Sequence, residues 1–103
     1  MKNFADIMKK AQQMQQKMAD MQKELESAEV TGAAGAGMVQ VVMTGDGKAR
    51  KVSIDPSVAQ DTEVLEDLLV VAINDARQKA DELVAQKTDA MKSGLNLPFK
   101  LPF

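Results

Sequence analysis

Two short glycine-rich stretches are the places in this sequence where residue spacing most suggests chemistry. Gly35-Ala36-Gly37 and Gly45-Asp46-Gly47-Lys48 each resemble part of a phosphate-binding loop. A P-loop, however, requires G-x-x-x-x-G-K-[ST] between a strand and a helix, and a dinucleotide-binding loop requires G-x-G-x-x-G at the start of a helix. Both stretches are flanked instead by strand-like sequence, so we interpret them as turns between strands.

Acidic pairs such as Glu66-Asp67 are the other candidates for catalysis, since neighbouring carboxylates can act as general acid and base. Their position in the first turns of a predicted helix gives them a different role, because carboxylates there interact favourably with the helix dipole. The 103 residues include no histidine and no cysteine, which excludes histidine catalysis, thiolate metal sites and disulfides. We therefore expect a protein that is not an enzyme and that uses no cofactor and no small-molecule substrate.

Basic residues are the remaining candidates for a binding function. The formal net charge of −2 argues against a protein that coats nucleic acid by bulk charge. The charges are nevertheless uneven, with five lysines against two aspartates between Met1 and Lys23, and three basic residues against one aspartate between Asp46 and Lys51. Such groups can neutralise phosphates, although a lysine on a helix is often only a solvated surface residue.

The stretch from Val30 to Pro56 is the part of the chain that is typical of β-sheet. Its valine-rich runs and its Gly45-Asp46-Gly47 turn predict a hairpin, and a short third strand is expected before it. Gly32 to Gly37 is interpreted as a flexible connection, because glycine accepts the positive φ values that a reversal needs. The predicted sheet is a three-stranded antiparallel meander with strands at about 29–31, 38–44 and 48–54.

A long helix is predicted before this sheet, at about residues 3–28. Its apolar positions recur at alternating spacings of three and four, which is the pattern of a coiled-coil seam. The seam contains Phe4, Ile7, Ala11, Met14, Met18, Met21, Leu25 and Ala28. Its methionines are interpreted as core residues facing another helix, since methionine packs adaptably; a groove for a metal or an apolar ligand is the alternative.

A second long helix is predicted after the sheet, at about residues 62–92. Asp55-Pro56 begins a short helical turn, Asp61-Thr62 offers the N-cap of the long helix, and Ser93-Gly94 is expected to end it. The first half of this helix has apolar residues around nearly its whole circumference, so we expect it to cover the sheet. Its apolar stripe comprises Leu65, Leu69, Ala72, Ala76, Ala80 and Leu83, widened by Val64, Leu68, Val71 and Ile73.

If the seams of the two long helices pack together, the helices run antiparallel as an arm roughly 35 to 45 Å long. The tip of this arm would gather basic residues from both helices, namely Lys2, Lys9, Lys10, Lys87 and Lys92. The apolar segment from Gly94 to Phe103 contains two prolines and is expected to be an extended tail. The sequence does not distinguish a tail that docks on the helix pair from a tail that moves freely.

These elements indicate a single α+β domain with an α-β-β-β-α order. A small sheet with projecting helices buries little core, so oligomerisation is expected. Charged and amide residues interrupt every apolar run, which leaves no membrane span or signal peptide and predicts a cytoplasmic protein.

The sequence also resembles the YbaB/EbfC family of bacterial nucleoid-associated DNA-binding proteins. The resemblance is carried, in order, by AQQMQQKM, VTGAAGAGMVQVVMTGDG, VSIDPS, LEDLLVVAINDA and SGLNLPFKLPF. It implies a homodimer whose sheets join at the base and whose helical arms stand apart like tweezers. It further implies that the helices bind duplex DNA, with a role in nucleoid organisation or gene regulation.

The basic residues that match the DNA-binding helices, together with the one at the start of the chain, are Lys2, Lys9, Lys10, Lys17, Arg77, Lys79 and Lys87. The absence of tryptophan and tyrosine favours duplex DNA over single strands, on which bases stack against aromatic side chains. The alternative function is that of a structural or adaptor protein, which would bind a protein partner through its methionine-rich seams and apolar tail.

Overall fold

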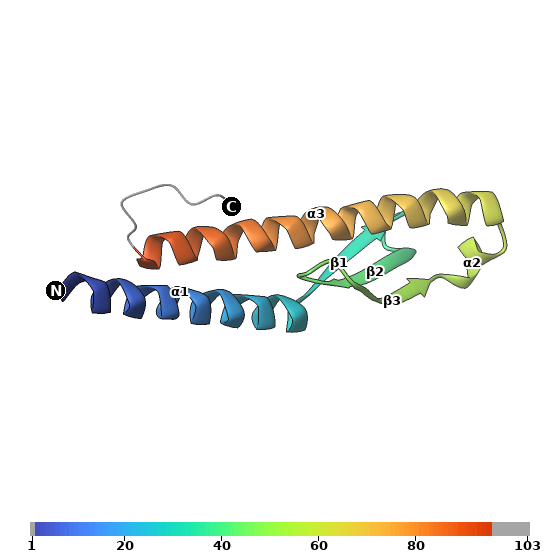
Figure 1. Cartoon of the computed structure of the whole chain (residues 1–103). Coiled ribbons are helices and arrows are strands. Elements are labelled where there is room, and N and C mark those ends of the chain that lie inside the picture. Colours follow the sequence, from blue (N-terminus) through green and yellow to red (C-terminus); the bar gives the residue numbers. More distant parts are fainter. Residues whose placement is uncertain (1, 96–103) are drawn as a thin grey trace.

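The computed structural model describes residues 2–95, and the side chains of residues 3–91. The element order is α1 (Lys2–Ser27), β1 (Glu29–Ala34), β2 (Val39–Thr44), β3 (Ala49–Ile54), α2 (Pro56–Ala59) and α3 (Thr62–Leu95). The molecule is elongated, with extents of 71 × 20 × 16 Å. Figure 1 shows α1 and the C-terminal half of α3 side by side and antiparallel, with the sheet beyond the end of α1. The predicted α+β fold is confirmed.

The sheet is the predicted antiparallel meander, with the order β1-β2-β3 and β2 at its centre. The predicted turn between β2 and β3 is present, and Thr44 N–H donates to Lys48 O at 2.7 Å while Gly47 N–H donates to Thr44 O at 2.9 Å. Along the register, Gly32 pairs with Val41 and Val41 pairs with Val52. Because directly paired residues of neighbouring strands point to the same face, these three residues lie in one row on one face of the sheet.

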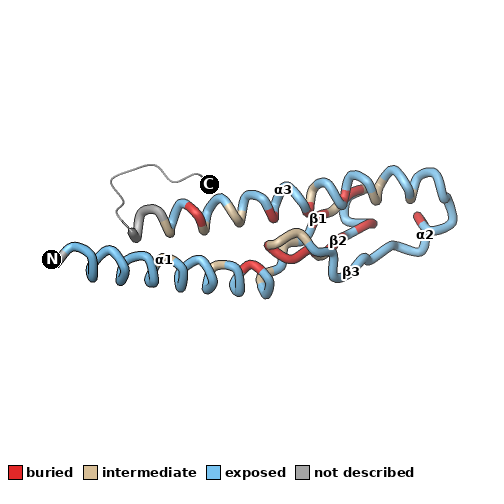
Figure 2. Tube along the Cα trace, in the orientation of Figure 1, coloured by how far each residue is buried: buried red, intermediate tan, exposed pale blue. Residues whose placement is uncertain are grey.

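Helix α3 covers this face over β1 and β2. Ala72, Ala76 and Ala80 are almost fully buried against Val39 and Val41 of β2, and partly buried leucines extend the contact toward the start of α3. In Figure 2 the buried positions follow this contact, whereas β3 is exposed along its whole length. The small alanine side chains allow the axis of α3 to approach the strands closely.

The first strand is longer than predicted, because Gly32, Ala33 and Ala34 belong to it. The turn is formed by Gly35 to Met38, and β2 begins at Val39, one residue later than predicted. Gly32 is buried under α3, and a Cβ added there would overlap the carbonyl oxygen of Ala72 and the backbone nitrogen of Ala76. The interpretation of Gly32 as part of a flexible connection was therefore wrong. This glycine is required by close packing, and not by a reversal of the chain.

Both predicted helix starts are confirmed. The Asp55 carboxylate accepts hydrogen bonds from Ser57 N–H at 2.9 Å and Ser57 Oγ at 2.7 Å, and Asp61 accepts one from Val64 N–H at 3.3 Å. Helix α3 ends at Leu95, three residues later than predicted, because one glycine near a helix end costs only about 1 kcal/mol. The predicted tail therefore loses residues 94 and 95 to the helix, and its remainder, residues 96–103, lies outside the described residues.

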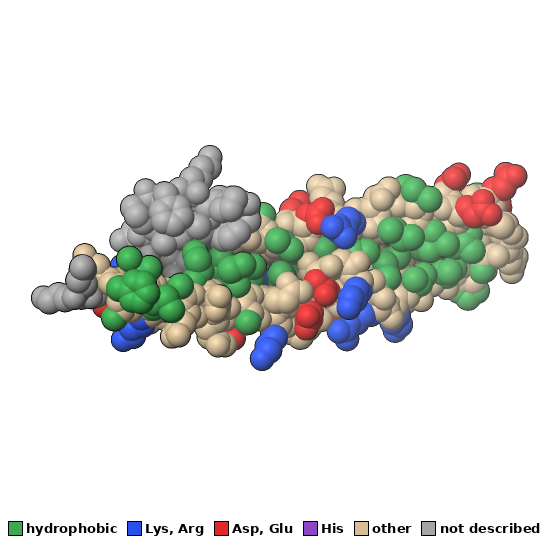
Figure 3. All heavy atoms as spheres, in the orientation of Figure 1, with side chains coloured by type: hydrophobic (Ala, Val, Ile, Leu, Met, Phe, Trp, Pro, Cys, Tyr) green, Lys and Arg blue, Asp and Glu red, His purple; other side chains and the backbone are tan. Residues whose placement is uncertain are grey.

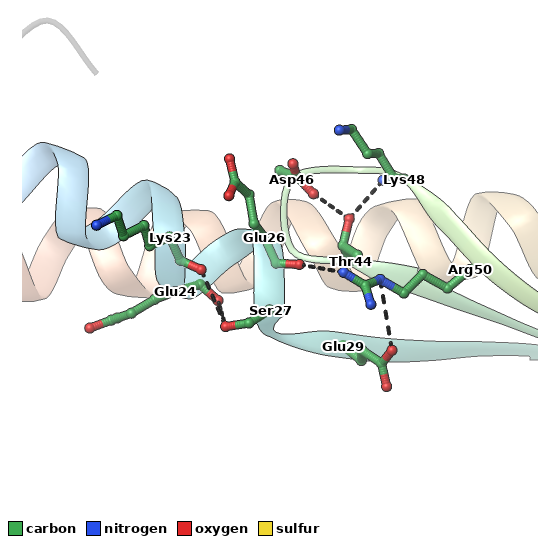
Figure 4. Close-up of polar contacts among 9 residues, drawn as sticks. All are labelled: Lys23, Glu24, Glu26, Ser27, Glu29, Thr44, Asp46, Lys48 and Arg50. Carbon is green, nitrogen blue, oxygen red and sulfur yellow. Dashed lines mark hydrogen bonds and ion pairs between the residues drawn. The ribbon is translucent and has the colours of Figure 1, made fainter.

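Helix α1 is anchored to the sheet at its C-terminal end. Leu25 is 4% exposed, Gly45 N–H donates to Ala28 O at 3.0 Å, and Arg50 of β3 donates to Glu26 O at 3.0 Å. Figure 4 shows this junction, in which Arg50 lies between the carbonyl group of Glu26 and the carboxylate of Glu29. A guanidinium group at this position satisfies a carbonyl group at the end of α1 and interacts favourably with the helix dipole.

The prediction that the α1 seam packs along α3 was wrong for the N-terminal part of the seam, whereas Met21 and Ala28 are partly buried and Leu25 is buried. Phe4 is 71% exposed and Ile7 62% exposed, and Met18 is also exposed. A strict seven-residue repeat drifts by about 20° per heptad around a straight helix, so a seam that begins against its neighbour turns away from it. The first half of α3 also covers less of the sheet than predicted, since its apolar side chains Val64, Val71 and Ile73 are exposed.

The close contact between Gly32 and α3 predicts that Gly32→Ala destabilises the fold strongly. The added methyl group must displace helix backbone, so we expect a loss of about 3 kcal/mol in the free energy of unfolding. Gly37→Ala is the matched control, because its positive φ costs only about 1 kcal/mol and its added methyl group meets no backbone. Urea denaturation of both variants measures the difference, and equal losses would contradict this account of Gly32.

Candidate nucleic-acid interface

The lysines of α1 are the basic side chains that are most available for an external anion. Lys9, Lys10 and Lys17 are exposed, and none makes an ion pair within 4.0 Å with another side chain of residues 3–91. The side chains of Lys2 and Lys92, which were predicted to belong to the same basic tip, lie outside the described side chains. A lysine without an internal partner contacts a phosphate without first losing an existing ion pair.

The three basic residues of α3 whose side chains the structure describes are all engaged within the chain. Arg77 Nε lies 3.1 Å from Asp81 Oδ1, Lys79 Nζ lies 3.2 Å from Asp75 Oδ2, and Lys87 Nζ lies 2.9 Å from Glu24 Oε2. The Lys87 pair links α3 to α1, and Lys87 and Lys17 border one shallow groove between these helices. Asp20 and Glu24 line the same groove, so its charge is mixed.

Lys79 and Asp75 together cover the outer edge of β1. Lys79 Nζ donates to Thr31 O at 2.9 Å, and the Asp75 carboxylate accepts a hydrogen bond from Ala33 N–H at 2.9 Å. The bond from Ala33 N–H, and then the bond from Lys79, hold the pKa of Asp75 below its ordinary value. These two side chains therefore serve the fold, and the prediction that Lys79 binds DNA gains no support from its geometry.

Three exposed lysines outside the predicted set extend the basic surface. Lys23 ends the charged segment of α1, and Lys48 and Lys51 flank Arg50 at β3. None of the three makes an ion pair with another described side chain. In Figure 3 most of the visible lysine and arginine side chains lie along one long edge of the molecule, below α1 and the sheet, with acidic side chains between them. The local charge excess between Asp46 and Lys51 was the sequence feature that could have identified the β3 part of this edge.

Acidic side chains lie both at the junction of α1 with the sheet, where Figure 4 shows Glu24, Glu26 and Glu29, and in two regions away from the α1 lysines. The first turns of α3 carry Glu63, Glu66 and Asp67 at the sheet end of the molecule, where acidic groups gather in Figure 3. A groove between the β2–β3 turn and α3 is lined by three aspartates, Asp46, Asp81 and Asp89, against one Arg77. Both regions repel phosphate, so a polyanion is directed to the basic edge.

This arrangement agrees with a comparison of the chain with known families. Residues 1–95 match the model of the YbaB/EbfC DNA-binding family. The chain belongs to this family. The description of the YbaB/EbfC family names DNA binding.

Two relatives align with this chain over their full lengths. The chain is 50% identical to a nucleoid-associated protein of Granulibacter bethesdensis and 53% identical to one of Paramagnetospirillum magneticum, in each case over all of both chains. The crystal structure of the uncharacterized protein HP0035 from Helicobacter pylori has a TM-score of 0.77 and 24% identity, covering 85% of this chain and 95% of that one. The YbaB/EbfC fold of this chain is thus shared with a solved structure.

Within residues 2–95, no helix is both long and apolar enough to cross a membrane.

The hydrogen bonds of Asp75 predict a dependence of stability on pH. Its pKa is lower in the folded state than in the unfolded state, so the stabilisation is complete at neutral pH and is lost as the pH falls below about 4. Asp75→Asn should weaken this acid-induced loss, whereas Asp89→Asn, with the same change in charge on an exposed position of α3 far from its N-terminus, should not. Denaturation midpoints are measured from pH 7 to pH 3 for the original protein and for both variants. If the midpoint falls with pH equally in all three proteins, Asp75 is not the source of the acid-induced loss.

Proposed function

We propose that this protein is a nucleoid-associated protein that binds duplex DNA through the basic edge formed by α1 and β3. The observation that carries the proposal is that Lys9, Lys10 and Lys17 are exposed on one helix and have no ionic partner among the described side chains. Membership of the YbaB/EbfC DNA-binding family supports the same function, as do the names of its nucleoid-associated relatives.

The chemistry of this edge favours contacts with the phosphate backbone over contacts with bases. Lysine is a flexible point charge, which neutralises phosphates but carries little sequence information. The exposed part of the edge holds several lysines, whereas Arg50, the β3 residue best suited to bidentate contacts, is engaged with Glu26 and Glu29. We expect binding with limited sequence preference, a strong dependence on salt, and a role in organising the nucleoid or regulating genes.

We further propose that the protein acts as a homodimer joined at the sheet end. The two outer edges of the sheet differ, since the edge of β1 is covered by Asp75 and Lys79, whereas β3 is exposed along its length. An uncovered edge strand with valine and isoleucine side chains is a surface that proteins usually protect. Pairing with a second copy is one way of protecting it.

An apolar patch beside β3 supports the same interface. Val52 and Ile54 lie on the sheet face that α3 covers elsewhere, yet they are 47% and 38% exposed. Ile73 lies one helical turn before Arg77, whose guanidinium group lies beside Gly47 of the β2–β3 turn, so Ile73 borders β3 as well. Figure 3 shows hydrophobic side chains gathered at this end of the molecule. Burying this sheet-end patch (Val52, Ile54 and Ile73) in a dimer leaves the α1 lysines free. Lys51 also stays free, because its side chain points to the opposite face of β3 from Val52.

The DNA-binding proposal predicts that Lys9→Gln combined with Lys10→Gln weakens binding and lowers its salt dependence. The slope of log affinity against log salt should fall by about one for each lysine that contacts a phosphate. Gel-shift or fluorescence-anisotropy titrations with a short duplex at several salt concentrations measure this slope.

The matched control is Asn74→Asp combined with Gln60→Glu, which changes the net charge by the same amount at exposed positions outside α1 and β3. We expect the control to bind nearly as the original protein does. If both double variants weaken binding equally, bulk charge and not the α1 lysines governs affinity. If neither does, the proposed interface is wrong.

The dimer proposal predicts that Val52→Glu shifts the protein toward a monomer, because it places a charge within the sheet-end patch. Ser53→Glu is the control, since its side chain points to the opposite face of the same exposed strand. Light scattering coupled to size exclusion measures the mass of each variant across a range of concentrations. A dimer that survives Val52→Glu unchanged, or a monomeric original protein, would overturn the proposed interface.

A further inference from the structure

The N-terminal part of α1 has an exposed apolar surface that the described part of the chain does not cover. Phe4, Ile7 and Met18 are exposed, and together with Ala11 they follow one side of the helix. A helix whose apolar stripe remains in water is stabilised only by its own propensity, which is marginal for isolated helices. We call this surface the α1 stripe.

The residues that follow α3 have the pattern of an extended segment with one apolar side. Leu97, Phe99, Leu101 and Phe103 occur at every second position, and Asn96, Pro98, Lys100 and Pro102 occupy the positions between them. In an extended segment, alternate side chains point to the same side. Proline removes a backbone donor and opposes helix formation, so the segment is suited to lie along a surface and unsuited to prolong α3.

The end of α3 is close to the α1 stripe. Lys87 is paired with Glu24, and Met91, one turn later, borders a groove with Met21 and Lys17 of α1. Because the helices run antiparallel, Leu95 lies near the level of Met14. From Met14 to Phe4 the helix spans about 15 Å, and the segment 96–103 reaches about 26 Å when extended.

We propose that the C-terminal segment Asn96–Phe103 docks on the α1 stripe of its own chain, with its leucine and phenylalanine side chains toward Phe4, Ile7 and Ala11. The sequence contains three phenylalanines, and this arrangement brings Phe99 and Phe103 of the segment to the same surface as Phe4. Aromatic side chains contribute large apolar areas and favourable edge-to-face contacts, so a short segment gains substantial burial from them.

Docking in this way leaves the basic edge available. Lys9 lies opposite the α1 stripe, and Lys10 and Lys17 lie about a quarter turn from it. The docked segment would stabilise the free end of α1, which is anchored to the rest of the molecule mainly through Leu25 and the Lys87–Glu24 pair. The inference is independent of DNA binding, because it concerns an apolar surface on another side of the helix.

Paramagnetic relaxation in solution tests the proposal directly. The chain has no cysteine, so Lys100→Cys carries a single nitroxide label, and its position between the apolar residues leaves them unchanged. We expect broadened amide signals for residues 4–14 in the isotope-labelled protein. A label at Gln60→Cys, beyond the sheet, should leave those signals sharp.

Replacing Phe99 and Phe103 by serine should abolish the broadening, whereas Asn96→Ser, on the other side of the segment, should preserve it. Unchanged signals from the sheet confirm that each variant is folded. Absence of broadening on α1 in the original sequence would overturn the proposal. Broadening that appears only between spin-labelled and isotope-labelled chains in a mixed sample would also overturn it, since the α1 stripe would then bind a second copy.

Discussion

The structure depends on the close approach of α3 to β1, which is possible because Gly32 has no side chain. Its Cα faces the backbone of Ala72 and Ala76, so helix and strand are in direct contact. This contact fixes the position of α3 over two strands and leaves β3 uncovered. It also brings Asp75 and Lys79 to the outer edge of β1, where they bond Ala33 and Thr31. The covering of the β1 edge by α3 side chains thus depends on the close approach at Gly32.

The sequence was sufficient to predict features that depend on local interactions. The Gly45-Asp46-Gly47 turn, the caps at Asp55 and Asp61 and the order of the elements are set by residues close in sequence, and all are confirmed. The extent of β1 was not predictable in this way, because glycine and alanine have low strand propensity and are ordered here by α3. The exposed α1 seam was missed because periodicity indicates an apolar stripe but not what covers it.

The basic surface was predictable in part. Local charge balance identified the α1 lysines, which are exposed and without ionic partners among the described side chains. It could not separate them from Lys79 and Lys87, whose partners lie 48 and 63 residues away in the sequence. Only the folded chain distinguishes a lysine that holds two elements together from a lysine that is available for a phosphate. This distinction moves the candidate interface from both helices to α1 and the neighbouring β3.

A protein with a net charge of −2 can therefore present exposed lysines along α1, because many of its acidic residues lie at the sheet end and along the groove beside α3. The central claim is that DNA binds the basic edge and avoids the acidic end. Chemical-shift mapping during titration with a short duplex tests this claim most directly. The account predicts perturbed amides along α1 around Lys9 to Lys17 and along β3, with little change between Asp61 and Asp67. Perturbations confined to that acidic end, or none at low salt, would contradict it.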